Sequence, residues 1–176
     1  PARVVKEKGI IEFIKASRLL KQYKYKFVVA GSLDYAKSSG LKKEELEEAN
    51  IDKTVKFIGY QKNIYKILKK TAIVCLPSYR EGLPKSLCEA AACGIPIVTT
   101  KSVGCTEVVK SKFNGELCRI KDYLSLATKI KKLILEPKLR AIYGKNSINF
   151  AKKNFDIKLI GNKIIDIYNE LLIYEK

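Results

Sequence analysis

Two glutamates and the stretch between them are the residues best suited to chemistry. Glu81 lies in a polar loop after the apolar run 73–76, and Glu89 lies eight residues later in a small-residue stretch. Eight residues are about two helical turns, so both carboxylates would lie on a similar side of a helix. Carboxylates accept hydrogen bonds from hydroxyl groups, and the spacing predicts a hydroxyl-rich ligand. The structural alternative has Glu81 as a helix-dipole partner and Glu89 paired with Lys85 at i,i+4.

The segment between the glutamates is suited to an anion. Pro84 fits the first turn of a helix, where its missing N–H costs nothing. The amide groups of residues 82–86 would then be free at a helix N-terminus, which favours negative charge. Near the start of the chain, Arg3 and Lys8 are cations that could neutralise a phosphate leaving group. The alternative is that they are ordinary surface charges among 35 Lys and Arg residues.

Apolar runs alternate with amphipathic stretches, and continuous runs such as 26–30 are typical of strands buried on both faces of a parallel sheet. The expected strands are 4–5, 26–30, 55–58, 73–76, 95–98 and 116–118, and the expected helices are 10–20, 41–50, 63–70, 107–110 and the stretches that follow Pro84, Asp122, Pro137 and Asp156. The pattern predicts an α/β fold, a doubly wound parallel sheet of about six strands with helices on both faces. Ligands of such folds bind at the carboxyl ends of the strands.

Two glycines, Gly31 and Gly59, each end an apolar run. Backbone without a side chain would let a nucleotide approach closely, while the alternative is an ordinary glycine between strand and loop.

Composition indicates a globular chain with a core, since 47% of its 176 residues are hydrophobic and 30% are charged. No run of eighteen apolar residues is present, so no membrane span is expected. The chain has no recognisable signal peptide and no Met, and its first strand looks cut short, so we expect a piece of a longer polypeptide. Its five cysteines include no C-x-x-C pair and it has no His, which argues against zinc and for buried thiols in a reducing cytosol.

The formal net charge of +17 has three explanations. Lysines are scattered over every expected helix, which fits a Lys-rich solvated surface. Attraction to an anionic membrane or to a phosphorylated substrate is the second explanation. Nucleic acid is the third, and the absence of a nucleic-acid motif argues against it. The sequence also lacks D-x-D, G-x-x-x-x-G-K and G-x-G-x-x-G motifs, so a carboxylate-held metal on a diphosphate is not expected.

The strings PSYREGLP and EAAACGIPIV, with RVVKEKGI at the start, together resemble the donor-site signature of the retaining GT-B glycosyltransferases of family 4, the glycosyl transferases group 1. The resemblance implies that residues 1–176 form one nucleotide-sugar (donor) binding domain, the C-terminal half of a GT-B fold. It also implies that the N-terminal acceptor domain of the full-length enzyme is absent. The usual Glu-Gly-Phe-Gly is Glu-Gly-Leu-Pro here, which removes one backbone donor and is interpreted as a difference in donor preference.

The resemblance also implies roles for individual residues. Arg3 and Lys8 would bind the donor diphosphate, and Glu81 would contact hydroxyls of the donor sugar. These three are the expected catalytic residues. The expected donor-binding residues are Gly31, Gly59, Gly82, Leu83, Pro84, Leu87 and Glu89, with Leu87 near the phosphates or ribose and Glu89 on the ribose hydroxyls. No metal ligand and no cofactor other than the donor, a UDP- or GDP-sugar, is expected.

The implied function is retaining, metal-independent transfer of a sugar to an acceptor (EC 2.4 class) in bacterial surface polysaccharide, lipopolysaccharide or glycolipid synthesis. The acceptor domain of the same polypeptide would be a partner, and this piece alone is expected to be inactive. The expected location is the cytoplasm, with peripheral attachment to the inner face of the membrane as an option. Two alternatives remain: a non-catalytic nucleotide-sugar binding module and a GT-B-type nucleotide-sugar epimerase domain.

Overall fold

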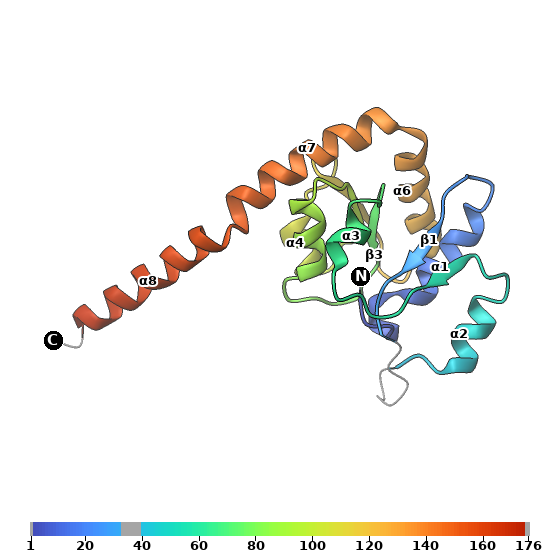
Figure 1. Cartoon of the computed structure of the whole chain (residues 1–176), viewed down its shortest axis with the longest axis horizontal. Coiled ribbons are helices and arrows are strands. Elements are labelled where there is room, and N and C mark those ends of the chain that lie inside the picture. The colour runs from blue at the N-terminus through green and yellow to red at the C-terminus, as the bar shows by residue number, and fades with distance from the viewer. Residues whose placement is uncertain (1, 33–39, 175–176) are drawn as a thin grey trace.

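The computed structural model describes residues 2–32 and 40–174 (Figure 1). Within them, five parallel strands form two sheets. The first sheet pairs β1 (Phe27–Val29) with β2 (Val55–Phe57), and the second has the order β3 (Val74–Leu76), β4 (Ile97–Thr100), β5 (Gly115–Cys118). The helical elements are η1 (Lys6–Lys8), α1 (Ile10–Leu19), α2 (Lys43–Ala49), α3 (Ile64–Leu68), α4 (Lys85–Ala92), α5 (Cys105–Val108), α6 (Tyr123–Leu135), α7 (Pro137–Asn154) and α8 (Ile157–Tyr174).

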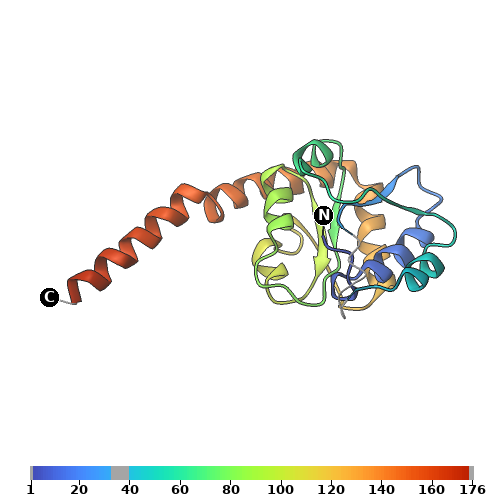
Figure 2. The ribbon, with the colours of Figure 1, turned by 60° about the horizontal axis from the view of Figure 1, so that its bottom comes forward.

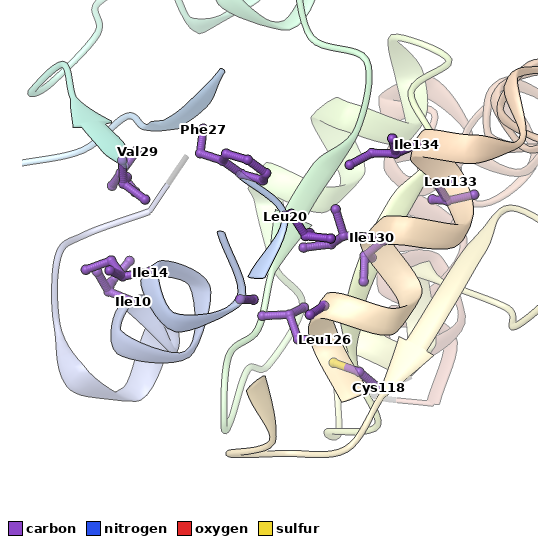
Figure 3. Packing of buried hydrophobic residues seen from close by; sticks show 14 of the residues in the cluster. Ile10, Ile14, Leu20, Phe27, Val29, Cys118, Leu126, Ile130, Leu133 and Ile134 are labelled. Atoms are coloured by element: carbon purple, nitrogen blue, oxygen red, sulfur yellow. The ribbon is translucent and has the colours of Figure 1, made fainter. Parts of the chain in front are cut away.

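The structure confirms a parallel α/β fold with helices on both faces of the sheet. Along β3 and β4, Val74, Leu76 and Ile97 pack in one apolar cluster with α4 and α5. Val98 and Cys118 pack in a second cluster on the other face, with α1, α6 and β1 (Figure 3). Because side chains alternate along a strand, each continuous apolar run serves both clusters.

The strand arrangement differs from the expected single sheet of about six strands. Residues 4–5 form an isolated antiparallel bridge between Val5 and Gly40. The amides of Ala2 and Val4 donate to the carbonyls of Ala30 and Ser32 at 3.0 and 3.1 Å, so this first segment runs parallel to β1 but beyond its end. A cavity of about 600 Å³ is lined by residues of β1 and β3, among other elements.

Three elements begin two residues away from their expected positions, and one of them is α2, expected from residue 41 and starting at Lys43. The strand expected at 95–98 starts at Ile97, because the amide of Ile95 donates to Ala90 at the end of α4 and Pro96 has no N–H. The short helix expected at 107–110 runs instead as α5, from residue 105 to 108, after Gly104 in a positive-φ conformation (80°). It ends there because the side chain of Asn114 bonds to the backbone at residues 108 and 110.

Helices α7 and α8 lie at the end of the chain. Helix α7 packs closely on α4, where a Cβ added to Gly144 would lie 2.3 Å from the carbonyl oxygen of Gly94. Helix α8 projects away from the body of the molecule in both views (Figures 1 and 2). Its large apolar side chains are exposed over the described part, from Ile157 to Leu172. None of the described helices has the length and apolar character needed to cross a membrane.

Candidate active site

A cleft of about 400 Å³ lies beyond the carboxyl ends of β1, β2 and β3. The parallel topology brings the loops after these strands to one edge, as expected for this class of fold. The predicted site residues that line the cleft are Arg3, Lys8, Gly31, Glu81, Leu83, Pro84 and Glu89. The predicted anion-binding stretch 82–86 contributes Lys85 and Ser86 as well, and lining residues to which the sequence analysis gave no ligand role include Ser32 and Gln61. Their polar side chains are too common on a surface to have been identified without the fold.

The floor of the cleft contains an ion pair between Lys8 and Glu81, with 2.5 Å between Nζ and Oε1. Both side chains are largely shielded from water, at 19% and 12% exposure. Gly9 makes this approach possible, since it ends η1 at φ 68° and an added Cβ would lie 2.1 Å from the carbonyl oxygen of Pro77. The two charges therefore stabilise each other in a site with restricted solvent.

The N-terminus of α4 forms a second side of the cleft. Pro84 is the N-cap residue, immediately before the first turn in which it was expected, and its carbonyl accepts from the amides of Leu87 and Cys88. The amides of the first helical residues, Lys85 and Ser86, have no acceptor within the helix, and both residues line the cleft. Their N–H groups and the helix dipole favour an anion there.

Glu89 lies one turn farther along α4 and keeps 35% of its side chain exposed. Its Oε1 is 3.9 Å from Nζ of Lys85, whose side chain is 90% exposed. The expected i,i+4 alternative is therefore present, but so exposed a pair contributes little. The carboxylate of Glu89 also lines the cleft, so one residue fits both interpretations.

Three predicted residues are placed differently. The side chain of Leu87 is fully buried in the cluster beneath α4, so only its backbone can approach a ligand. Gly59 (φ 65°) accepts a hydrogen bond from the amide of Gly31 at 2.8 Å, which ties the ends of β1 and β2 together. Gly82 does not line the cleft, although a Cβ there would meet open space.

The packing of Gly31 also favours the alternative in which it is an ordinary structural glycine between strand and loop. A Cβ on Gly31 would lie 1.7 Å from the carbonyl oxygen of Ala2. The first segment of the chain therefore requires glycine at this position, whatever the cleft binds.

Comparison with known proteins identifies the family. The family model for glycosyl transferases group 1 matches residues 1–150. An N,N'-diacetylbacillosaminyl-diphospho-undecaprenol alpha-1,3-N-acetylgalactosaminyltransferase from Campylobacter jejuni is 32% identical over 171 residues, covering 97% of this chain and 44% of that protein. The chain thus spans less than half the length of this relative.

Solved structures of glycosyltransferases have a fold similar to that of this chain. The C-terminal domain of LpcC, a glycosyl transferase group 1 family protein from Francisella tularensis, is 29% identical, with a TM-score of 0.72 and coverage of 88% of this chain and 83% of that one. HepE from Anabaena, solved in complex with UDP, is 24% identical, with a TM-score of 0.84 and coverage of 96% and 47%. By its sequence and its fold, the chain belongs to the glycosyl transferases group 1 family.

Proposed function

We propose that this chain is the donor-binding domain of a glycosyltransferase and binds a nucleotide-diphosphate sugar in the cleft described above. The observation that carries the proposal is the meeting of three features in one cleft: the Lys8–Glu81 ion pair, the N-terminus of α4 and the carboxylate of Glu89. HepE from Anabaena has been solved with UDP and with UDP-glucose, and its fold is similar.

A diphosphate fits beside the cations and amides of this cleft. In the proposed complex, Arg3, Lys8 and the amides of Lys85 and Ser86 surround the phosphates. Such donors stabilise the negative charge that develops on the departing diphosphate. Oxygens of Glu81 are free to accept hydrogen bonds from the donor sugar, while Lys8 shifts part of its interaction from this carboxylate to the phosphate.

Glu89 is the proposed ribose partner. Its carboxylate lies along α4, beyond the N-terminal amides, and accepts two hydroxyl donors without displacing a buried partner. The reaction proposed is transfer with retention at the anomeric carbon, by a front-face route without a metal, in which the departing diphosphate takes the acceptor's proton.

The rest of the reaction is assigned to the remainder of the polypeptide. We propose that a preceding domain holds the acceptor, so that this chain alone transfers little or no sugar. The exposed apolar face of α8 supports such a partner, because so many exposed large apolar side chains are unusual on an isolated helix. The LpcC C-terminal domain, solved on its own, supports folding of this half as a domain.

The pathway is proposed by similarity. The name of the Campylobacter jejuni relative gives an N-acetylgalactosaminyltransferase that acts on a diphospho-undecaprenol-linked sugar. We propose a related role here, on the cytoplasmic side of the membrane. The net charge of +17 supports contact with an anionic lipid surface or an anionic lipid-linked substrate.

Isothermal titration of the chain with UDP, GDP and ADP tests the donor site. Saturable binding of one nucleotide is expected, weakened about tenfold or more in Lys8→Ala and Glu89→Ala. Lys6→Ala is the matched control for Lys8, because Lys6 pairs with Glu45 on the exposed side of η1. Absence of saturable binding at millimolar nucleotide, or equal weakening in the control, would contradict the proposal.

A further inference from the structure

A buried serine links the loop that contains Glu81 to the turn that contains Lys8 by hydrogen bonds. Ser78 has no exposed surface, and its Oγ lies 3.0 Å from the carbonyl oxygen of Glu7 and 3.2 Å from that of Arg80. One hydroxyl proton is shared between these two acceptors. The amide of Tyr79 also donates to Glu7, at 2.8 Å. The two chain segments are thus joined by adjacent donors from the loop.

The two carbonyl acceptors of Ser78 belong to residues next to the Lys8–Glu81 ion pair. Glu7 directly precedes Lys8, and Arg80 directly precedes Glu81. The hydroxyl therefore fixes the main chain next to both members of an ion pair that are 73 residues apart in sequence. Ser78 itself does not line the cleft, so it cannot contact a ligand there.

Strand β4 also holds Ser78, through a hydrogen bond from its last residue. The hydroxyl of Thr100 donates to the carbonyl of Ser78 and lies 3.0 Å from Oγ of Ser102. All three side chains are buried, and each has a hydrogen-bond partner. A buried network with its groups satisfied holds one geometry, because any displacement would leave a polar group without its partner.

We propose that Ser78 is a positioning residue for the donor site. Its hydroxyl sets η1 and the loop 77–84 at the separation that lets Lys8 and Glu81 meet, and the pair then presents the cation to the diphosphate and the carboxylate to the sugar. The binding part of this inference rests on the proposed function. Loss of the hydroxyl leaves the Tyr79–Glu7 bond in place, so the fold persists while the pair shifts, and small misplacements of such groups reduce their effect strongly.

Ser147 provides the matched control. It lies on α7, outside the cleft, and is also fully buried. Its Oγ donates to the carbonyl of Asn114 at 3.2 Å. Ser78→Ala and Ser147→Ala each remove one buried hydroxyl of this kind, so their melting temperatures should fall by similar amounts. In titration with UDP, or with whichever nucleotide the wild type binds, Ser78→Ala is expected to weaken affinity about five- to tenfold and Ser147→Ala less than about twofold. Equal effects, or unchanged affinity in Ser78→Ala, would overturn the proposal.

A second readout needs no ligand. The coupling between Lys8 and Glu81 is measured by urea unfolding of Lys8→Ala, Glu81→Ala and the double variant, each with Ser78 present and with Ser78→Ala. The coupling is expected to fall by about half or more when the hydroxyl is removed. An unchanged coupling would refute positioning, even in a protein that binds no nucleotide and so fails the proposed function. If Ser78→Ala does not fold, Ser78→Cys, nearly equal in shape and a weaker donor, replaces it in both experiments.

Discussion

The buried carboxylate of Glu116 in β5 gives the most detailed prediction for stability. Its oxygens contact Nζ of Lys132 at 2.6 Å, Nζ of Lys129 at 3.0 Å and the hydroxyl of Tyr143 at 2.9 Å. Glu116→Gln keeps the shape of the side chain but replaces one carboxylate oxygen with an NH₂ group, which then faces a lysine or tyrosine that is itself a donor. Breaking a fully buried ion pair costs about 3–5 kcal/mol. Both lysines are about one-third exposed, which lowers the expected loss to about 2 kcal/mol.

The pH dependence of this loss follows from the same contacts. Burial opposes the charge on Glu116, but hydrogen bonds from Lys132, Lys129 and Tyr143 outweigh it and hold the pKa below its ordinary value of 4.5. A carboxyl with a lowered folded pKa contributes stability above its unfolded pKa, and this contribution is lost as the pH falls through the folded value. The wild type should therefore lose more stability than Glu116→Gln between about pH 4.5 and the acid limit of the measurement.

Urea unfolding followed by circular dichroism at pH 7 and at steps down to pH 3 tests both statements. Glu48→Gln, an exposed site on α2, is the control for loss of one carboxylate. A Glu116→Gln variant within about 0.5 kcal/mol of the wild type at pH 7 would refute the reasoning, since that is the range of ordinary surface substitutions. Parallel acid curves for the two proteins would refute the pH argument.

Four shorter predictions concern two glycines, the cleft and the strands. Gly104→Ala should destabilise the fold by about 2 kcal/mol or more in urea unfolding, because φ is 80° and the new Cβ would lie 2.0 Å from the carbonyl oxygen of Gly82. Gly59→Ala, at φ 65° but with open space around it, should cost only about 1–2 kcal/mol, and equal losses would contradict the steric argument. Lys85→Ala should leave stability within about 0.5 kcal/mol of the wild type, because its pair with Glu89 is exposed. Adding about four residues of alternating Val and Thr before the N-terminus should raise the melting temperature by filling the cavity beside β1 and β3, and no rise would show that this cavity does not accept a strand.

Local signals in the sequence predicted most of the elements. A helix was expected after Asp122, and the side chain of Asp122 accepts from the amide of Ser125 at 2.8 Å at the start of α6. Asp156 similarly accepts from the amide of Lys158 at the start of α8. Caps and apolar runs depend on neighbours in sequence, which is why they could be read without the fold.

Contacts between distant segments were not predictable in the same way. The sequence placed Lys8 and Glu81 in one site, but their direct pairing depends on Gly9 packing against Pro77 and on the hydroxyl of Ser78. Gly31 was assigned to the donor because it ends an apolar run, and Leu87 was assigned by the resemblance. The structure adds packing reasons for glycine at one position and leucine at the other, which depend on contacts between distant segments.

A ¹H–¹⁵N correlation spectrum of the labelled chain, titrated with UDP and UDP-glucose, tests the central claim most directly. Binding at the proposed site should shift the amide signals of Lys85 and Ser86 first, together with those of Lys8 and Gly31, in a saturable manner. Helix α6, on the other face of the sheet, should show no change. Saturable shifts confined to α6 and the cavity beside β1 and β3, or no shifts at millimolar nucleotide, would contradict a donor site at the N-terminus of α4.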